Sequence, residues 1–93
     1  MASFNDFLVW EASSRDVIDF KKIYVDMCED DVIAGLLLSQ ICYWHLPTKH
    51  GESKLRIEKD GLMWLAKRHE DWWDEIRLKR DRVIRALDVL KSI

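Results

Sequence analysis

Residues 32–46 read VIAGLLLSQICYWHL, and this stretch is apolar nearly all round. Its strongly polar members are Ser39, Gln40 and His45. A helix that lacks a polar face is surrounded by other elements, so the stretch is predicted to be the central helix of the fold. The acidic residues 29–31 favour a helix start, because carboxylates cap free N–H groups, and Pro47 favours its end. The expected core anchors on this helix are Leu36, Leu37, Ile41 and Trp44.

The size and composition of the chain indicate one small domain. Its 93 residues are 48% hydrophobic and 34% charged, which allows one modest core and leaves little room for a large catalytic cleft. We therefore expect no enzyme activity, no cofactor and no small-molecule substrate. The longest apolar run, Val32–Leu38, is far shorter than the ~20 residues of a membrane-spanning helix, so we expect a soluble, cytoplasmic protein without a membrane partner. Cys28 and Cys42 are expected to be reduced and buried, and the spacing of Cys and His residues argues against a metal site.

Two segments precede the central helix. Residues 1–15 are interpreted as an N-terminal arm ahead of a single domain at 16–93, because Phe4–Trp10 is too aromatic for a disordered tail yet fits neither a helical nor a strand period. We expect this arm to dock elsewhere on the protein. Over residues 23–28, Ile23, Val25 and Met27 alternate with Tyr24, Asp26 and Cys28. This alternation favours a short strand, although a helix stays possible.

A β-hairpin is predicted over residues 54–66, after a loop at 48–53. Its turn is Asp60-Gly61, a pair that tolerates the positive backbone angles of a two-residue turn. The register follows by counting outwards from that turn, and it gives the hairpin one apolar face. The expected cross-strand pairs are Ile57 with Trp64 and Leu55 with Ala66.

Two further helices are predicted, at residues 69–76 and at about 79–91. In the first, Trp72 is expected in the core and Trp73 on the surface, because adjacent helical residues point about 100° apart. The second helix has basic residues on its outer side, so the pair has the pattern of a helix-turn-helix. Its inward stripe is expected to be Val83, Ala86, Leu87 and Leu90.

Charge is distributed unevenly along the chain. The net charge of −2 combines a net −5 over residues 1–46 with a net +3 over residues 47–93. Arg is the side chain that offers guanine two hydrogen bonds in the major groove, so the base-contacting candidates are Arg80, Arg82 and Arg85. The candidates for DNA phosphate contacts are Lys67, Arg68, Arg77 and Lys79. The alternative interpretation is that these cations form an ordinary solvated helix face.

Six short motifs follow one another along the chain in an order that is typical of a known family. IYVDM at 23–27, IAGLLLSQI at 33–41 and YWH at 43–45 are followed by GLMW at 61–64, EDW at 70–72 and RVIRAL at 82–87. Over about residues 18–91 this order resembles the N-terminal winged-helix domain of replication initiators from phages, plasmids and integrative elements of Gram-positive bacteria, DnaD-like in the broad sense.

The resemblance implies a mainly α fold with a small β-hairpin, a winged-helix-like helix-turn-helix domain. The family continues after its last helix with a two-stranded wing, whereas this chain stops at Ile93, so the C-terminal wing is expected to be lacking. It implies a function in DNA replication initiation, with the helix at about 79–91 in the major groove of double-stranded DNA. Arg80, Arg82 and Arg85 match the family's recognition-helix positions, and replication proteins are the implied protein partners.

A protein–protein interaction module is the alternative function. It would be a dimerisation domain, pairing two copies of the chain, or a small phage-type inhibitor of a host factor. The surface expected to carry this function is aromatic and comprises Phe4, Phe7, Trp10 and Trp73. DNA affinity that falls steeply with salt would favour the DNA-binding interpretation.

Overall fold

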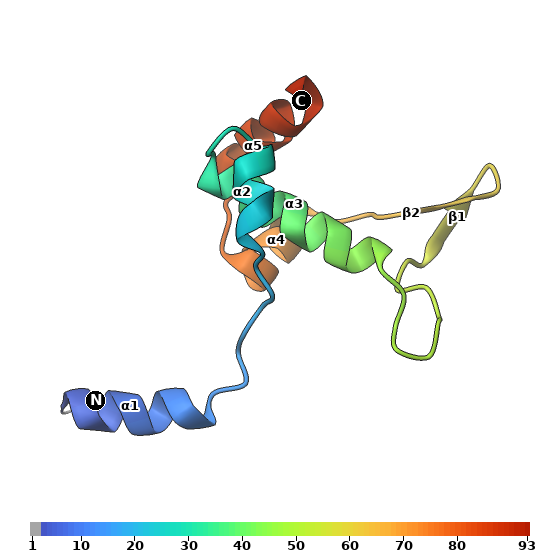
Figure 1. Cartoon of the computed structure of the whole chain (residues 1–93). Coiled ribbons are helices and arrows are strands. Elements are labelled where there is room, and N and C mark those ends of the chain that lie inside the picture. Colours follow the sequence, from blue (N-terminus) through green and yellow to red (C-terminus); the bar gives the residue numbers. More distant parts are fainter. Residues whose placement is uncertain (1–2) are drawn as a thin grey trace.

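The computed structural model describes residues 3–93 and is mainly helical, with one small two-stranded antiparallel hairpin (Figure 1). Within this range no helix is both long and apolar enough to cross a membrane. In chain order the elements are α1 (Phe4–Ser13), α2 (Lys22–Met27), α3 (Val32–His45), β1 (Ile57–Lys59), β2 (Leu62–Trp64), α4 (His69–Ile76) and α5 (Arg80–Ser92).

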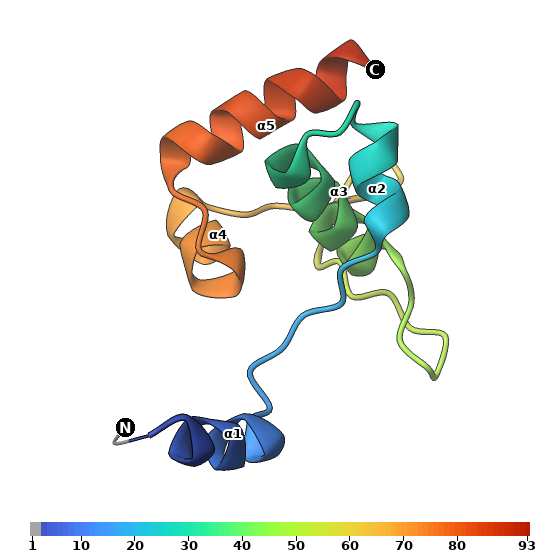
Figure 2. The same cartoon turned by 60° about the vertical axis from the view of Figure 1, so that its left-hand side comes forward.

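Helix α3 is the centre of the fold, as predicted. Asp31 caps its start, where its Oδ1 accepts a hydrogen bond from the backbone N–H of Ala34 at 2.9 Å. Helices α2 and α5 pack against α3, and Figure 2 shows α5 crossing it. The expected anchor Leu37 is fully buried in the core, whereas the expected anchors Leu36 and Ile41 are partly buried. The buried core comprises Cys28, Ala34, Leu37, Trp72, Ile76, Leu78, Val83 and Ala86.

The segment at 23–28 is a helix, so the prediction of a strand there is wrong. Alternation in the sequence also placed Tyr24 and Cys28 four residues apart, which is the spacing of one helical face. Helix α2 turns this face towards α3 and comes so close that a methyl group on Gly35 would lie 2.8 Å from the Cα of Val25. A strand at this place would have no neighbouring strand to pair with in the described chain, since β1 and β2 pair with each other.

The hairpin has the predicted turn and register but shorter strands. Asp60 and Gly61 have φ values of 55° and 76°, and Ile57 pairs with Trp64. The ladder ends at that pair, so the expected pair of Leu55 and Ala66 does not form. All side chains of β1 and β2 are exposed, and the hairpin extends away from the helices (Figure 1).

The N-terminal segment is a helix, and it does not dock on the described chain. Ser3 caps α1 by accepting a hydrogen bond from the N–H of Asp6 at 3.2 Å. No residue of α1 is buried, and an extended segment at 14–21 separates it from α2 (Figure 1). The radius of gyration is therefore 16.1 Å, against about 12 Å for a compact domain of this length. The sequence did not predict this helix because its apolar residues lie on several sides of it and so show no clear helical periodicity.

Candidate nucleic-acid interface

A three-residue turn joins α4 to α5. Arg77 takes a left-handed conformation with φ 59°, and its backbone N–H donates to the carbonyl oxygen of Trp73 at 2.9 Å. Its guanidinium Nη1 donates to the same oxygen at 3.1 Å. A non-glycine residue in this conformation costs about 1–2 kcal/mol, which the side-chain contact partly offsets. Leu78 is buried between the two helices, so the turn is fixed at both of its faces.

The ring of Trp73 contacts two cationic side chains on the outer side of this turn. The guanidinium of Arg77 lies 5.3 Å from the ring centroid, and the ammonium of Lys79 lies 5.7 Å from it. Both distances are within the range of cation–π attraction. Trp73 is 41% exposed and Trp72 is 7% exposed, so the predicted division between surface and core is confirmed. Trp73 therefore holds cations in place on the surface of the helix pair.

The three arginines of α5 occupy two flanks of the helix. Arg80, Arg82 and Arg85 are all exposed, and within residues 3–93 none of them forms an ion pair. Arg82 and Arg85 line one shallow cleft of about 170 Å³ together with Asp31, at the start of α3. Arg80 precedes Arg82 by two positions, which is about 200° around a helix, and projects from the opposite flank. The structure thus brings together two of the three predicted base-contacting residues.

The outward side of α5 between these flanks carries two carboxylates. Asp81 and Asp88 are seven residues apart, so they lie on one line of the helix surface, and both are exposed. Asp81 lies in the first helical turn, where its charge complements the helix dipole. The cationic surface of α5 is therefore two basic edges that border an acidic line.

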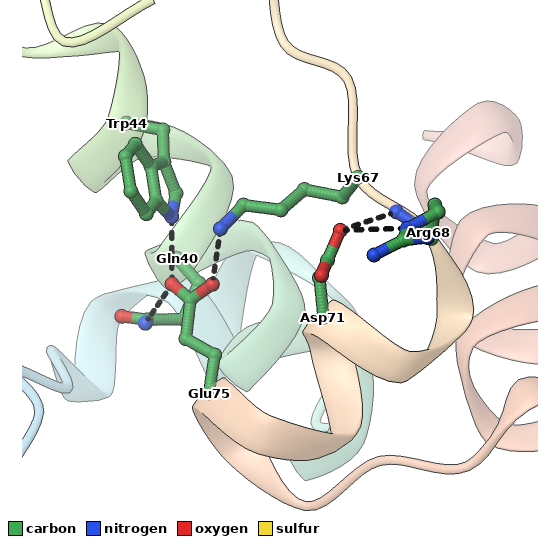
Figure 3. Close-up of polar contacts among 6 residues, drawn as sticks. All are labelled: Gln40, Trp44, Lys67, Arg68, Asp71 and Glu75. Carbon is green, nitrogen blue, oxygen red and sulfur yellow. Dashed lines mark hydrogen bonds and ion pairs between the residues drawn. The ribbon is translucent and has the colours of Figure 1, made fainter.

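The two other predicted phosphate contacts, Lys67 and Arg68, differ from the cations of the turn and α5. Lys67 forms an ion pair with Glu75 at 2.7 Å and lies 3.7 Å from the ring centroid of Trp44 (Figure 3). Its side chain is 15% exposed, so the structure places this predicted phosphate contact in an ion pair within the fold. Arg68 precedes α4, where its backbone N–H donates to Asp71, and its side chain is exposed.

Glu75 is a key residue that the sequence interpretation missed. Its Oε1 accepts hydrogen bonds from Gln40 Nε2 at 2.7 Å and from Trp44 Nε1 at 2.6 Å, while Oε2 meets Lys67 (Figure 3). These bonds tie α4 to α3. The available signal was the spacing Trp72, Glu75 and Ile76, which places a carboxylate inside the inward stripe of α4.

The cleft beside this network is mainly acidic, although Lys67 also lines it. This cleft of about 640 Å³ lies between α3, α4 and the segment before α2, and its carboxylates are Asp19, Asp71, Asp74 and Glu75. A phosphate backbone would be repelled there. Within the described chain, no group of three or more His, Cys, Asp or Glu side chains is arranged to hold a metal ion. This cleft is therefore a poor candidate for contact with DNA, in contrast to the turn and the edges of α5.

The remaining candidates of the aromatic surface lie on α1. Phe4 and Phe7 have ring centroids 6.2 Å apart, and those of Phe7 and Trp10 are 6.0 Å apart, so the three rings form a ridge. Trp73 lies on α4 instead, against the side chains of Arg77 and Lys79. Comparison with known proteins gives no matching family model, no matching curated protein and no matching solved structure.

Proposed function

We propose that this chain is a double-stranded DNA-binding domain of the winged-helix type, acting in the replication initiation of a mobile element, with α5 in the major groove. One observation carries the proposal. Five cations on the turn and on the first two turns of α5 are exposed, and within residues 3–93 they form no ion pairs. They are Arg77, Lys79, Arg80, Arg82 and Arg85.

Each cation has a role that follows from its position. Arg85 lies nearest to the outward line of α5, so it is the first candidate to reach a base edge, with Arg82 beside it. Arg80 on the other flank faces the opposite wall of the groove. Arg77 and Lys79, held against the ring of Trp73, are candidates for phosphate contacts.

The outward carboxylates have a place in this arrangement. Asp81 and Asp88 repel phosphates, but a carboxylate in the major groove accepts a hydrogen bond from the amino group of cytosine. They therefore lower general affinity for DNA and favour particular bases. Because the chain as a whole has a net charge of −2, binding by a single copy is expected to be weak.

Fluorescence anisotropy of a labelled 30-base-pair duplex tests the proposal. Neutralising about four phosphates would make affinity fall on the order of 100-fold between 50 and 200 mM salt. The double variant Arg82→Glu, Arg85→Glu should abolish measurable binding. The control Lys21→Glu, Lys49→Glu makes the same change of charge at exposed sites away from α5 and should reduce affinity much less. Equal loss in both variants, or DNA binding that ignores salt, would contradict the assignment.

A second candidate function is a protein–protein interaction module. The observation that favours it is the exposed aromatic ridge of α1, which contributes nothing to the core of this chain. This candidate predicts association that persists without DNA and at high salt.

A further inference from the structure

Helix α1 presents apolar side chains to water along most of its length. Phe4 is 72% exposed and Trp10 is 52% exposed, and the side chains of Phe7 and Leu8 are also exposed. Phe4, Phe7 and Leu8 have the spacing i, i+3, i+4 of a helix that docks in a groove, whereas the i+7 position of that pattern is the charged Glu11. An apolar helix face of this kind is costly in water unless something covers it.

The same chain contains an apolar groove of about 520 Å³ at its other end. Ile41, Trp72 and Leu87 line it from α3, α4 and α5, and Leu62–Trp64 line it from the hairpin. The hairpin side chains are exposed, so this side of the groove is open to a partner. His45 lies at its edge on the last turn of α3.

Charge distinguishes this groove from the larger acidic cleft. Helix α1 carries Asp6 and Glu11 and no cation, so its net charge is −2. The lining of the apolar groove has no carboxylate, and its ionisable side chains are His45 and Lys67, of which Lys67 is already paired with Glu75. The acidic cleft of about 640 Å³ would repel α1 instead.

We propose that α1 of one copy docks in the apolar groove of a second copy, and that the reciprocal contact closes a two-fold dimer. A large aromatic side chain buries about 150–250 Å², so the exposed apolar area on the ridge of α1 is on the order of 400 Å². The exposed part of Leu62–Trp64 adds on the order of 300 Å². Two reciprocal contacts therefore bury about 1,400 Å², within the ~1,200–2,000 Å² of stable interfaces.

The occupant is a second copy because α1 points away from its own groove. The segment before α2 is fixed to α3, where Ser39 Oγ donates to the carbonyl oxygen of Asp19 at 3.1 Å. From that point α1 extends to one end of the molecule, and the hairpin extends towards the other (Figure 1). Both complementary surfaces occur once in each copy, which is the condition for a closed two-fold pair.

Sedimentation velocity of the full chain without DNA, from about 1 to 200 µM, tests this dimer. The wild-type chain should form dimers in this range. Two variants, Phe7→Ser with Trp10→Ser on α1 and Met63→Glu in the groove, should each weaken the dimer by about 30-fold or more. Val9→Ser is the control, because Val9 is 74% exposed on the opposite face of α1, and it should change the dimer Kd by less than about threefold. Circular dichroism and a urea melt establish that each variant is folded.

Mixing the two weakened variants separates reciprocal docking from other modes. The α1 variant keeps an intact groove and the Met63→Glu variant keeps an intact α1, so the mixture regains one contact and should associate more tightly than either variant alone. A mixture no tighter than its components contradicts the proposal. So does a dimer insensitive to Met63→Glu, which would indicate pairing of two α1 helices. A wild-type monomer at all concentrations would mean that α1 is covered by its own groove or by a different partner, and would also overturn it.

Discussion

Glu75 should be the most sensitive polar position of the helical core, and replacing it tests how α4 is held. The carboxylate accepts two short hydrogen bonds from α3, and its second oxygen pairs with Lys67. The side chains of the ion pair are each 15% exposed, so water replaces the lost contacts poorly. The two informative variants are Glu75→Gln and Glu75→Ala.

The structure predicts different losses in the free energy of unfolding for these two variants. A glutamine keeps a carbonyl oxygen for Gln40 and Trp44, but its amide group faces the ammonium of Lys67 as donor against donor. The loss is therefore one charge-assisted hydrogen bond, about 2 kcal/mol in the free energy of unfolding. An alanine leaves all three donors without their acceptor, and its cost should be about 3–5 kcal/mol. For a chain of this length, 2 kcal/mol corresponds to a fall in Tm of about 8–16 °C.

Urea unfolding followed by tryptophan fluorescence measures both variants, since the chain contains five tryptophans. Asp74→Asn is the matched control, because Asp74 lies next to Glu75 on α4 and is exposed. It should change the free energy of unfolding by less than about 0.5 kcal/mol. Values for Glu75→Gln and Glu75→Ala that match this control would show that the network does not hold α4 on α3, and would refute the reasoning.

Further predictions concern three residues, Gly35, Arg77 and Cys28. Gly35→Ala should destabilise the fold by about 1–3 kcal/mol in a thermal melt, because its new methyl group would lie 2.8 Å from backbone of Val25. Arg77→Gly should change stability by less than about 1 kcal/mol, since relief of the left-handed backbone offsets the lost side-chain contacts, yet anisotropy should record weaker DNA binding. Burial, with a smaller effect of Asp31, raises the pKa of the Cys28 thiol, so a thiol reagent at neutral pH should modify Cys28 far more slowly than denatured chain. The stability from this proton is complete below the ordinary thiol pKa and is lost as the pH rises past the raised value, which alkaline unfolding measures.

The parts of the fold that the sequence predicted are those with a local cause. Helix α4 was predicted with its observed ends, and Asp60-Gly61 alone specified the turn and register of the hairpin. The helical conformation of residues 23–28 depends instead on tertiary packing. Its helix is stabilised by close packing on Gly35, and the sequence gives no direct measure of that distance.

The candidate site divides in the same way. That Arg82 and Arg85 share an edge follows from helical spacing, but their position beside Asp31 depends on how α5 crosses α3. The charge of Lys67 is visible in the sequence and suggests a phosphate contact, whereas its pairing with Glu75, eight residues away on α4, depends on the tertiary fold. Charge can be counted along a sequence, but whether a charge is free depends on tertiary contacts.

The proposed dimer should raise the affinity of the protein for DNA. A single copy has five unpaired cations on the turn and the start of α5 and a net charge of −2, which gives weak binding to DNA, and a dimer has two such surfaces on one particle. Phe7→Ser with Trp10→Ser should therefore lower DNA affinity although α1 carries none of these cations, and the loss should be greatest at low protein concentration. Arg82→Glu with Arg85→Glu should leave the dimer intact. If disrupting α1 leaves DNA affinity unchanged at every concentration, the two surfaces act independently, and the weak charge of each copy would have to be compensated by direct base contacts of α5.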